Sequence, residues 1–201
     1  MGAQVPNTLY GLVLDGGKSS RMGFEKGQIM YHGQPQRDYV MQLLEQVCDA
    51  VFLGIRKAQV LEARNFSVIE DEDQYQGPLN SILSAHHQYP NVAWLVLACD
   101  LPFVDLSALE KLVNERDTSK IATAYAHHNG HVPEPLFAIW EPMSLESVKA
   151  YVKRTQKSSP RDFLMESDIK LVHPEDDIIL YNANNQTDFE WVKQKLNSKG
   201  E

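Results

Sequence analysis

Short apolar runs alternate along this chain with longer segments whose apolar residues recur at helical spacing. The runs have the length of strands, about four to eight residues, and the early ones contain few polar positions. Such runs are typical of strands that are buried on both faces. The predicted strands cover residues 9–14, 51–55, 66–69, 92–99, 121–126, 135–140 and 178–181.

Amphipathic segments between these runs predict helices. A helix that starts with proline is expected at Pro35, where the fixed φ of that residue suits the first turn. The other predicted helices begin at Gly77, after Asp105, over 145–156, over 160–167 and from about Asp188. Strands that alternate with helices in this way indicate a sheet with helices packed on both sides.

One departure from a purely parallel sheet is expected near Asn129-Gly130. Both residues tolerate a positive φ, so the chain can turn back there as a β-hairpin and add an antiparallel element. No repeat, linker or change of composition divides residues 1–201. The prediction is a single α/β domain, a three-layer α/β/α sandwich with a mixed, mostly parallel sheet.

Composition narrows the classes of partner. The net charge is −8 at pH 7, so a basic face for a nucleic-acid backbone is not expected and any anion site must be local. Cys48 and Cys99 are the only cysteines and lie in apolar runs, which suits a reducing compartment. Residues 92–99 form the longest apolar run, too short to cross a bilayer, and no signal peptide is predicted. We expect a cytoplasmic protein that binds neither nucleic acid nor membrane.

The loop after the first predicted strand, GGKSSRMGFEKG, is the first candidate site. Ligands of an open parallel sheet bind beyond the carboxyl ends of its strands. Gly16 and Gly17 allow a tight turn with exposed N–H groups, while Arg21 and Lys26 can hold phosphate oxygens. The loop fits neither a Walker A sequence nor a dinucleotide fingerprint. A glycine turn followed by solvated cations is the alternative interpretation.

A second candidate is Asp100, which directly follows a buried strand. A carboxylate there is costly unless it is hydrated, paired or bound to a cation. Mg²⁺ takes one or two carboxylates together with phosphate oxygens, so Asp100 is predicted to bind this ion, with helix capping as the alternative. A basic stretch follows later in the chain, typical of a solvated face but able to receive an anionic substrate. It contains Lys153, Arg154, Lys157 and Arg161.

The segment from Leu14 to Lys26 resembles a family signature, L-A-G-G-x-S-x-R-M-G-x-D-K. This is the signature of MobA-type molybdenum cofactor guanylyltransferases and their nucleotidyltransferase relatives. Two positions depart from it: Asp15 stands where the family has Ala, and Glu25 where it has Asp. Asp15 adds a carboxylate beside the nucleotide-binding turn, where it would either disfavour a triphosphate or meet a sugar hydroxyl.

Further blocks resemble the same family in the same order. EDEDQYQGPLNSI contains Asp71, at a position that the family uses near base and ribose, followed by Gly77 at a helix start. WLVLACDLPFV is similar to the family's strand that ends in Cys-Asp-Met-Pro, and Asp100 stands at the position of the family's Asp. EPLFAIW fits the family's pattern, and LYNANNQTDF is similar to its closing element through Asn182 and Asn184.

The resemblance implies a Rossmann-like nucleotidyltransferase fold and a reaction. GMP would pass from GTP to molybdenum-bound molybdopterin, with release of pyrophosphate. The implied catalytic residues are Arg21, Lys26 and Asp100, with Mg²⁺ on Asp100. The implied acceptor-side residues are Asn182 and Asn184. The implied nucleotide-binding residues are Leu14, Asp15, Gly16, Gly17, Lys26, Asp71 and Gly77.

The implied partners are GTP and molybdopterin, with proteins of molybdenum cofactor biosynthesis or acceptor proteins as further candidates. Two alternatives remain open at this point. One is a related nucleotidyltransferase that uses CTP or another acceptor. The other is a nucleotide-binding protein without catalytic activity.

Overall fold

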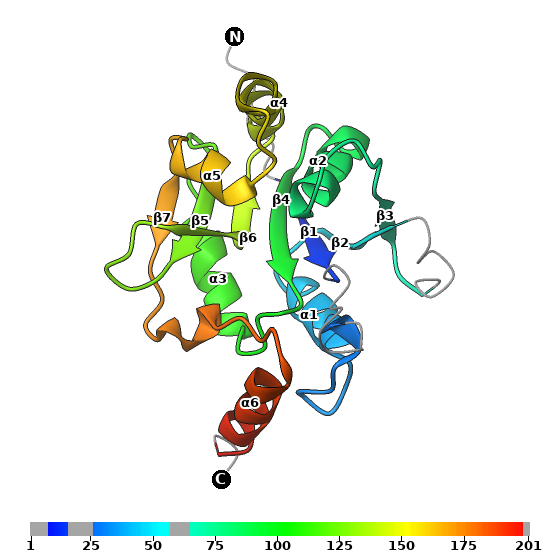
Figure 1. The fold of residues 1–201 in the computed structure, drawn as a ribbon, viewed down its shortest axis with the longest axis vertical. Helices are drawn as coiled ribbons and strands as arrows, with labels where there is room; N and C mark the ends of the chain where they lie inside the picture. The colour runs from blue at the N-terminus through cyan, green and yellow to red at the C-terminus, as the bar shows by residue number, and fades with distance from the viewer. Residues whose placement is uncertain (1–7, 16–25, 57–64, 199–201) are drawn as a thin grey trace.

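A computed structural model of the chain describes residues 8–15, 26–56 and 65–198 (Figure 1). In these ranges seven strands form one sheet in the order β3-β2-β1-β4-β6-β5-β7. The strands are β1 (Leu9–Leu14), β2 (Ala50–Ile55), β3 (Val68–Glu70), β4 (Ala93–Ala98), β5 (Ala122–Ala126), β6 (Pro133–Trp140) and β7 (Lys170–Val172).

Helices connect these strands. They are α1 (Gln36–Leu44), α2 (Pro78–Gln88), α3 (Leu106–Asn114), α4 (Ser144–Thr155), α5 (Pro160–Met165) and α6 (Gln186–Ser198), with short 3-10 helices η1 (Lys26–Gln28) and η3 (Asp177–Leu180). Helix α3 starts directly after Asp105, as predicted, and Asp105 caps it, because its side chain accepts a hydrogen bond from the Ala108 amide at 2.9 Å. Within the described ranges, no helix combines the length and apolar character needed to cross a membrane.

The sheet is mixed and mostly parallel, which confirms the predicted fold class. β1 pairs in parallel with both β2 and β4, and β2 with β3. β6 runs antiparallel between β4 and β5, and β7 is parallel to β5. The predicted hairpin joins β5 to β6, and Asn129 takes a φ of 60° in its turn.

The core lies on both faces of the sheet because successive strand residues point to opposite sides. Val13 and Leu97 pack toward the face that α1 and α3 cover. Leu12 and Val96 pack toward the opposite face, which α2, α4 and α5 cover. These residues are fully buried, so β1 and β4 are the apolar centre of a three-layer molecule.

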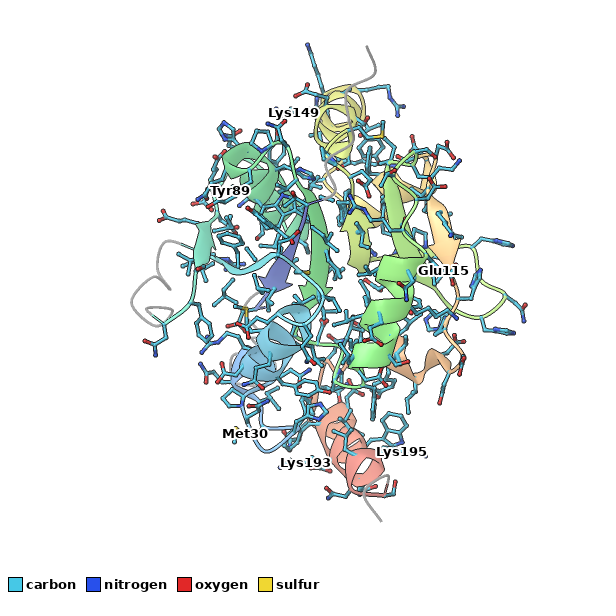
Figure 2. All side chains as sticks on the ribbon, turned by 180° about the vertical axis from the view of Figure 1, so that it is seen from behind. Met30, Tyr89, Glu115, Lys149, Lys193 and Lys195 are labelled. Atoms are coloured by element: carbon cyan, nitrogen blue, oxygen red, sulfur yellow. The ribbon has the colours of Figure 1, made fainter. Side chains whose placement is uncertain are left out.

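Helix α6 lies beyond the carboxyl end of β4, at the end of the molecule to which the β4 arrow points (Figure 1). A small third cluster joins it to the rest, with the Tyr31 and Phe189 rings 5.6 Å apart and the Phe103 and Trp191 rings also 5.6 Å apart. Lys193 and Lys195 lie on the same helix (Figure 2). This helix therefore borders the edge of the sheet at which ligands are expected.

Two predictions about the last third of the chain are wrong in detail. Residues 178–181 were predicted as a strand, but 178–180 belong to η3 and Tyr181 is its C-cap. The Asp176 side chain accepts a hydrogen bond from the Ile178 amide at 2.9 Å at the start of this helix. A strand that was not predicted, β7, pairs with β5 instead. An apolar run as short as residues 178–181 does not show whether its period is that of a strand or of a helix.

The buried His86 side chain makes the stability of the fold depend on pH. His86 is fully buried in α2, and its Nε2 lies 3.2 Å from the Ser144 Oγ. Burial, together with the smaller effect of the Lys149 charge, lowers the pKa of His86 to about 4. Because the unfolded chain binds the proton below a pKa of about 6.5, the free energy of unfolding falls as the pH drops from about 6.5 to 4. Above that window the contribution stays constant.

We expect His86→Gln to remove this part of the pH dependence. Between pH 7 and pH 5 the wild-type chain should lose about 2 kcal/mol more stability than the variant, a value that follows from the two pKa values by proton linkage. Urea unfolding at each pH measures the difference. His131→Gln is the matched control, because His131 is exposed. Parallel wild-type and His86→Gln curves would contradict the prediction.

Candidate active site

The first strand ends at a carboxylate that is already paired within the protein. The Asp15 side chain follows β1, is buried, and accepts a hydrogen bond from the Arg37 Nη1 at 3.0 Å. Arg37 lies in the first turn of α1, and its guanidinium also stands over the Phe66 ring, 5.1 Å from the ring centre. The carboxylate at the position of the family's Ala is therefore compensated by a buried cation.

Asp100 lies next to this strand end, at the carboxyl edge of β4. The Cys99 amide donates to the Leu14 carbonyl at 3.1 Å, which keeps the ends of β1 and β4 together. Burial raises the pKa of the Cys99 thiol well above its usual value, and the charges of Asp15 and Asp100 raise it further. Both carboxylates thus lie close to one buried thiol, and Asp100 itself is half-buried.

The loop that precedes α6 is hydrogen-bonded to Asp100. The Ala183 amide donates to the Asp100 carbonyl at 2.9 Å, so the loop containing Asn182 and Asn184 meets the edge of β4. Asn182 is half-buried, and its amide nitrogen donates to the Leu180 carbonyl at 3.2 Å. Asn184 is exposed. The structure therefore brings the two predicted acceptor-side residues to the predicted metal ligand.

Asp188 fixes the conformation of this loop. Its carboxylate accepts hydrogen bonds from the backbone amides of Asn184 and Asn185, at 2.7 and 3.1 Å, and from the Tyr181 hydroxyl at 2.9 Å. Partial burial would raise the pKa of Asp188, but these hydrogen bonds stabilise the charged form and lower it. The Asn185 side chain in turn accepts from the Asp188 amide at 3.0 Å, a reciprocal cap that starts α6.

The segment after η1 lies against the same edge. Burial, together with the charges of Asp188 and Asp100, raises the pKa of Tyr31 to about 12, so this phenol lies near both carboxylates. The neighbouring His32 ring lies 2.9 Å from the Pro102 carbonyl. Tyr31 and His32 are therefore packed against the turn that follows β4.

Asp71 is a third carboxylate at the carboxyl edge, after β3. Its amide donates to the Ile55 carbonyl at 2.8 Å, and its side chain is largely buried. Burial raises the pKa of Asp71, while hydrogen bonds with Ser81 and Asn80 act in the opposite direction. Both partners belong to the first turns of α2, so Asp71 is fixed to the start of that helix.

Gly77 marks the start of α2 and takes a backbone conformation that other residues avoid. Its φ is 68° and its ψ is −158°, a combination essentially restricted to glycine. Asn80 stabilises the loop before it, since its Oδ1 accepts from the amides of Gln74 and Tyr75, both at 3.1 Å. The predicted helix start is confirmed, and it lies beside Asp71.

These residues follow one edge of the sheet. β3 lies two places from β1 on one side, and β4 is the next strand on the other side. Asp71 and Asp100 are thus about three strand spacings apart, roughly 14 Å. A ligand that contacted both carboxylates would therefore have to extend along this edge.

Part of the predicted site lies outside the described residues. Gly16, Gly17 and Arg21 fall in the range 16–25, which the structure does not describe. The backbone of Lys26 opens η1, but its side chain is also outside the described part. The roles predicted for these four residues stay predictions.

The structure adds Glu134, a residue that the sequence patterns did not indicate. β6 runs antiparallel to β4, so Glu134 near its start lies at the edge where β4 ends. Burial raises the pKa of Glu134, and the charge of Asp100 raises it further. Its Oε2 accepts from the Arg161 Nη2 at 3.1 Å, which brings one cation of the predicted basic stretch to this edge. The predicted hairpin was the available signal, because its returning strand begins where the parallel strands end.

The donor set at this edge fits Mg²⁺ bound to a nucleotide. In the described parts of the chain, no three side chains among His, Cys, Asp and Glu form a closed metal site. Mg²⁺ is usually held by one or two carboxylates and takes its remaining ligands from phosphate and water. Asp100, with Glu134 close by, meets that requirement.

Known proteins resemble this chain in sequence. A model of the MobA-like NTP transferase domain matches residues 11–170. The chain is 34% identical over 183 residues to a molybdenum cofactor biosynthesis bifunctional protein of Synechocystis sp., covering 90% of this chain but only 52% of that relative. It thus spans about half the length of that protein. It is also 29% identical to a molybdenum cofactor guanylyltransferase of Histophilus somni, over 73% of this chain and 76% of the relative.

A solved structure resembles the fold. The crystal structure of molybdopterin-guanine dinucleotide biosynthesis protein A from Archaeoglobus fulgidus superposes with a TM-score of 0.76 and covers 94% of this chain and 99% of that one. The sequence identity is 21%, so this match bears on the fold alone. The family model, in contrast, covers most of the sequence. The chain therefore belongs to the MobA-like NTP transferase family.

Proposed function

We propose that this chain transfers GMP from GTP to the terminal phosphate of molybdenum-bound molybdopterin and releases pyrophosphate. The observation that carries the proposal is the hydrogen bond from the Ala183 amide to the Asp100 carbonyl, at 2.9 Å. It joins the backbone of Asp100, whose carboxylate is proposed for the triphosphate side, to the loop of Asn182 and Asn184, proposed for the acceptor side. The name of the Histophilus somni relative, molybdenum cofactor guanylyltransferase, supports the choice of reaction.

The reaction needs no nucleophile from the protein. An oxygen of the acceptor phosphate attacks the α-phosphorus of GTP and forms the new phosphoanhydride bond. The bond between the α-phosphorus and the oxygen bridging to the β-phosphate breaks, and pyrophosphate leaves with the electron pair. Catalysis then rests on holding the two phosphates in line and on neutralising the charge that develops on the leaving group.

On this proposal each part of the edge has one task. Asp100 holds Mg²⁺, which supplies positive charge to the phosphate oxygens when bound. Arg21 and Lys26 bind the leaving phosphates, and the backbone of Gly16 and Gly17 donates to the same groups.

The nucleoside and the acceptor occupy opposite ends of this edge. The backbone of Leu14 and Asp15 lines the nucleoside side together with Asp71 and Gly77. Asn182 and Asn184 orient the acceptor. Asp71 suits its task because Ser81 and Asn80 hold its carboxylate at the start of α2, where it can accept from donors on base or ribose.

The two cysteines bear on where in the cell the reaction takes place. Cys48 and Cys99 are both free, as expected in a reducing compartment, so we place the reaction in the cytoplasm. Proteins that deliver molybdopterin or receive the finished cofactor are the proposed partners. Neither nucleic acid nor a membrane is required.

Calorimetric titration with GTP, ATP, CTP and UTP, each with and without Mg²⁺, tests the proposal. We expect tight binding of GTP only in the presence of Mg²⁺, followed by pyrophosphate release when molybdenum-bound molybdopterin is added. Preference for CTP would overturn the choice of nucleotide and keep the reaction class. Binding of GTP without any pyrophosphate release would overturn catalysis and indicate a nucleotide-binding protein.

A further inference from the structure

The buried pair of Asp15 and Arg37 is not explained by nucleotide transfer as such. The family signature that this chain resembles has Ala in place of Asp15. The side chains of Asp15 and Arg37 are 4% and 10% exposed, and the Asp15 Oδ2 and Arg37 Nη1 atoms are 3.0 Å apart. Removing two charges from water costs several kcal/mol per ion unless the surroundings compensate. A buried pair at the end of β1 therefore implies that it holds a neighbouring element in place.

The Asp15 carboxylate is packed against the backbone of η1. A Cβ atom at Gly27 would overlap the carboxylate, so this close approach of η1 requires glycine. Gly27 does not take a positive φ, which means that space, and not backbone conformation, explains the glycine. Asp15 thus contacts Arg37 with one oxygen and faces η1 with the other.

The same segment is attached to α1 by its backbone. The Gln36 amide donates to the Ile29 carbonyl at 2.8 Å, and Met30 forms an isolated bridge with Pro35. Arg37, the next residue of α1, reaches back to Asp15. The end of β1, η1 and the first turn of α1 therefore form one connected unit around the carboxylate.

The negative charge of Asp15 also favours a supporting role for this residue over direct contact with the ligand. An unpaired carboxylate at this edge would repel a triphosphate. Arg37 neutralises it, so Asp15 can occupy a position beside the phosphate loop without opposing a polyanion. Only 6% of the Asp15 residue is exposed, so its side chain is directed into the protein.

We infer that Asp15 is a positioning residue: with Arg37 behind it, its carboxylate fixes η1 at the end of β1 and thereby sets where Lys26 meets the leaving phosphates. Lys26 directly precedes Gly27 in η1. The part of the inference that concerns Lys26 rests on the proposed function. The part that concerns η1 does not, so the two can be tested separately.

Amide hydrogen exchange of the free protein tests the position of η1. We expect Asp15→Ala to speed exchange of the Gly27 and Gln28 amides by about tenfold or more, and Asp15→Asn, which still accepts from Arg37, to change it little. The double variant Asp15→Ala/Arg37→Met removes the pair without leaving a buried cation, so it should fold and still exchange fast. Unchanged exchange in both alanine-containing variants would overturn the inference.

Glu141→Gln is the matched control. Glu141 belongs to another buried ion pair, with Arg116, remote in sequence from η1. Glu141→Gln should lower the stability of the whole chain. It should leave amide exchange at Gly27 and Gln28 unchanged relative to the other amides of η1 and α1. Equal acceleration in Asp15→Ala and Glu141→Gln would mean general destabilisation and would overturn a specific role.

Kinetics of GMP transfer test the consequence for Lys26. We expect Asp15→Ala to lower kcat by about 10- to 100-fold with a smaller change in the KM for Mg-GTP, and Asp15→Asn to restore most of the rate. Gly27→Ala, which displaces the carboxylate, should reproduce the loss. Fast exchange with wild-type kcat would overturn the link to Lys26. If the wild-type chain transferred no GMP, the proposed function would fail, while the exchange data would still decide the position of η1.

Discussion

Replacing Asp100 by alanine is expected to lower kcat for nucleotidyl transfer by about 10²–10³-fold, with the fold intact. The carboxylate is half-buried at the end of β4 and is the proposed ligand for Mg²⁺ on the triphosphate. Removing one interaction that stabilises developing charge in a transition state typically costs a factor of this size. Pyrophosphate release at saturating GTP and acceptor measures it.

Asp100→Ala tests the carboxylate alone, because it leaves the attachment of the neighbouring loop unchanged. The hydrogen bond from Ala183 ends on the Asp100 carbonyl, so alanine retains it and the loop of Asn182 stays attached. The dependence of GTP binding on Mg²⁺ should vanish together with turnover. Asp168→Ala is the matched control, because Asp168 is an exposed carboxylate that pairs with Lys120. Wild-type turnover in Asp100→Ala would rule out the proposed role.

The sequence predicted the fold best where the chain is buried on both sides. β1 and β4 are continuous apolar runs at the centre of the sheet, and the turn at Asn129 predicted the antiparallel strand β6. β7 escaped prediction because it has only three residues, of which Val172 alone is buried. η3 was mistaken for a strand because its cap, the Asp176 side chain, is a local interaction that overrides the apolar pattern.

For the candidate site, the sequence predicted which residues lie at the edge of the sheet, but not which side chains contact one another. Asp71 and Asp100 could be found because they directly follow strands whose carboxyl ends share one edge. The partner of Asp15 could not be found, since Arg37 lies 22 residues away and reaches it only through the packing of α1 on β1. Glu134 was missed because it lies at the start of a core strand and not after the end of one. Contacts of this kind depend on the three-dimensional arrangement of elements.

Truncating Glu141 to alanine is expected to lower the free energy of unfolding by about 3–5 kcal/mol, because it leaves the Arg116 charge buried without its bidentate partner. The guanidinium donates to the two carboxylate oxygens at 2.6 and 2.8 Å, and the two side chains are only 9% and 1% exposed. Urea denaturation at pH 7 measures the change. Glu146→Ala is the control, since its partner Lys149 is a surface residue and such pairs contribute less than about 1 kcal/mol.

The double variant Arg116→Met/Glu141→Leu separates the cost of an unpaired charge from the loss of packing. It removes both charges and keeps side chains of similar volume, so most of the lost stability should return. A coupling of several kcal/mol between the two positions would show that the pair is needed because each charge requires the other once the fold has buried both. A double variant as unstable as Glu141→Ala would instead assign the cost to packing between the end of α3 and the end of β6, and would contradict the electrostatic explanation.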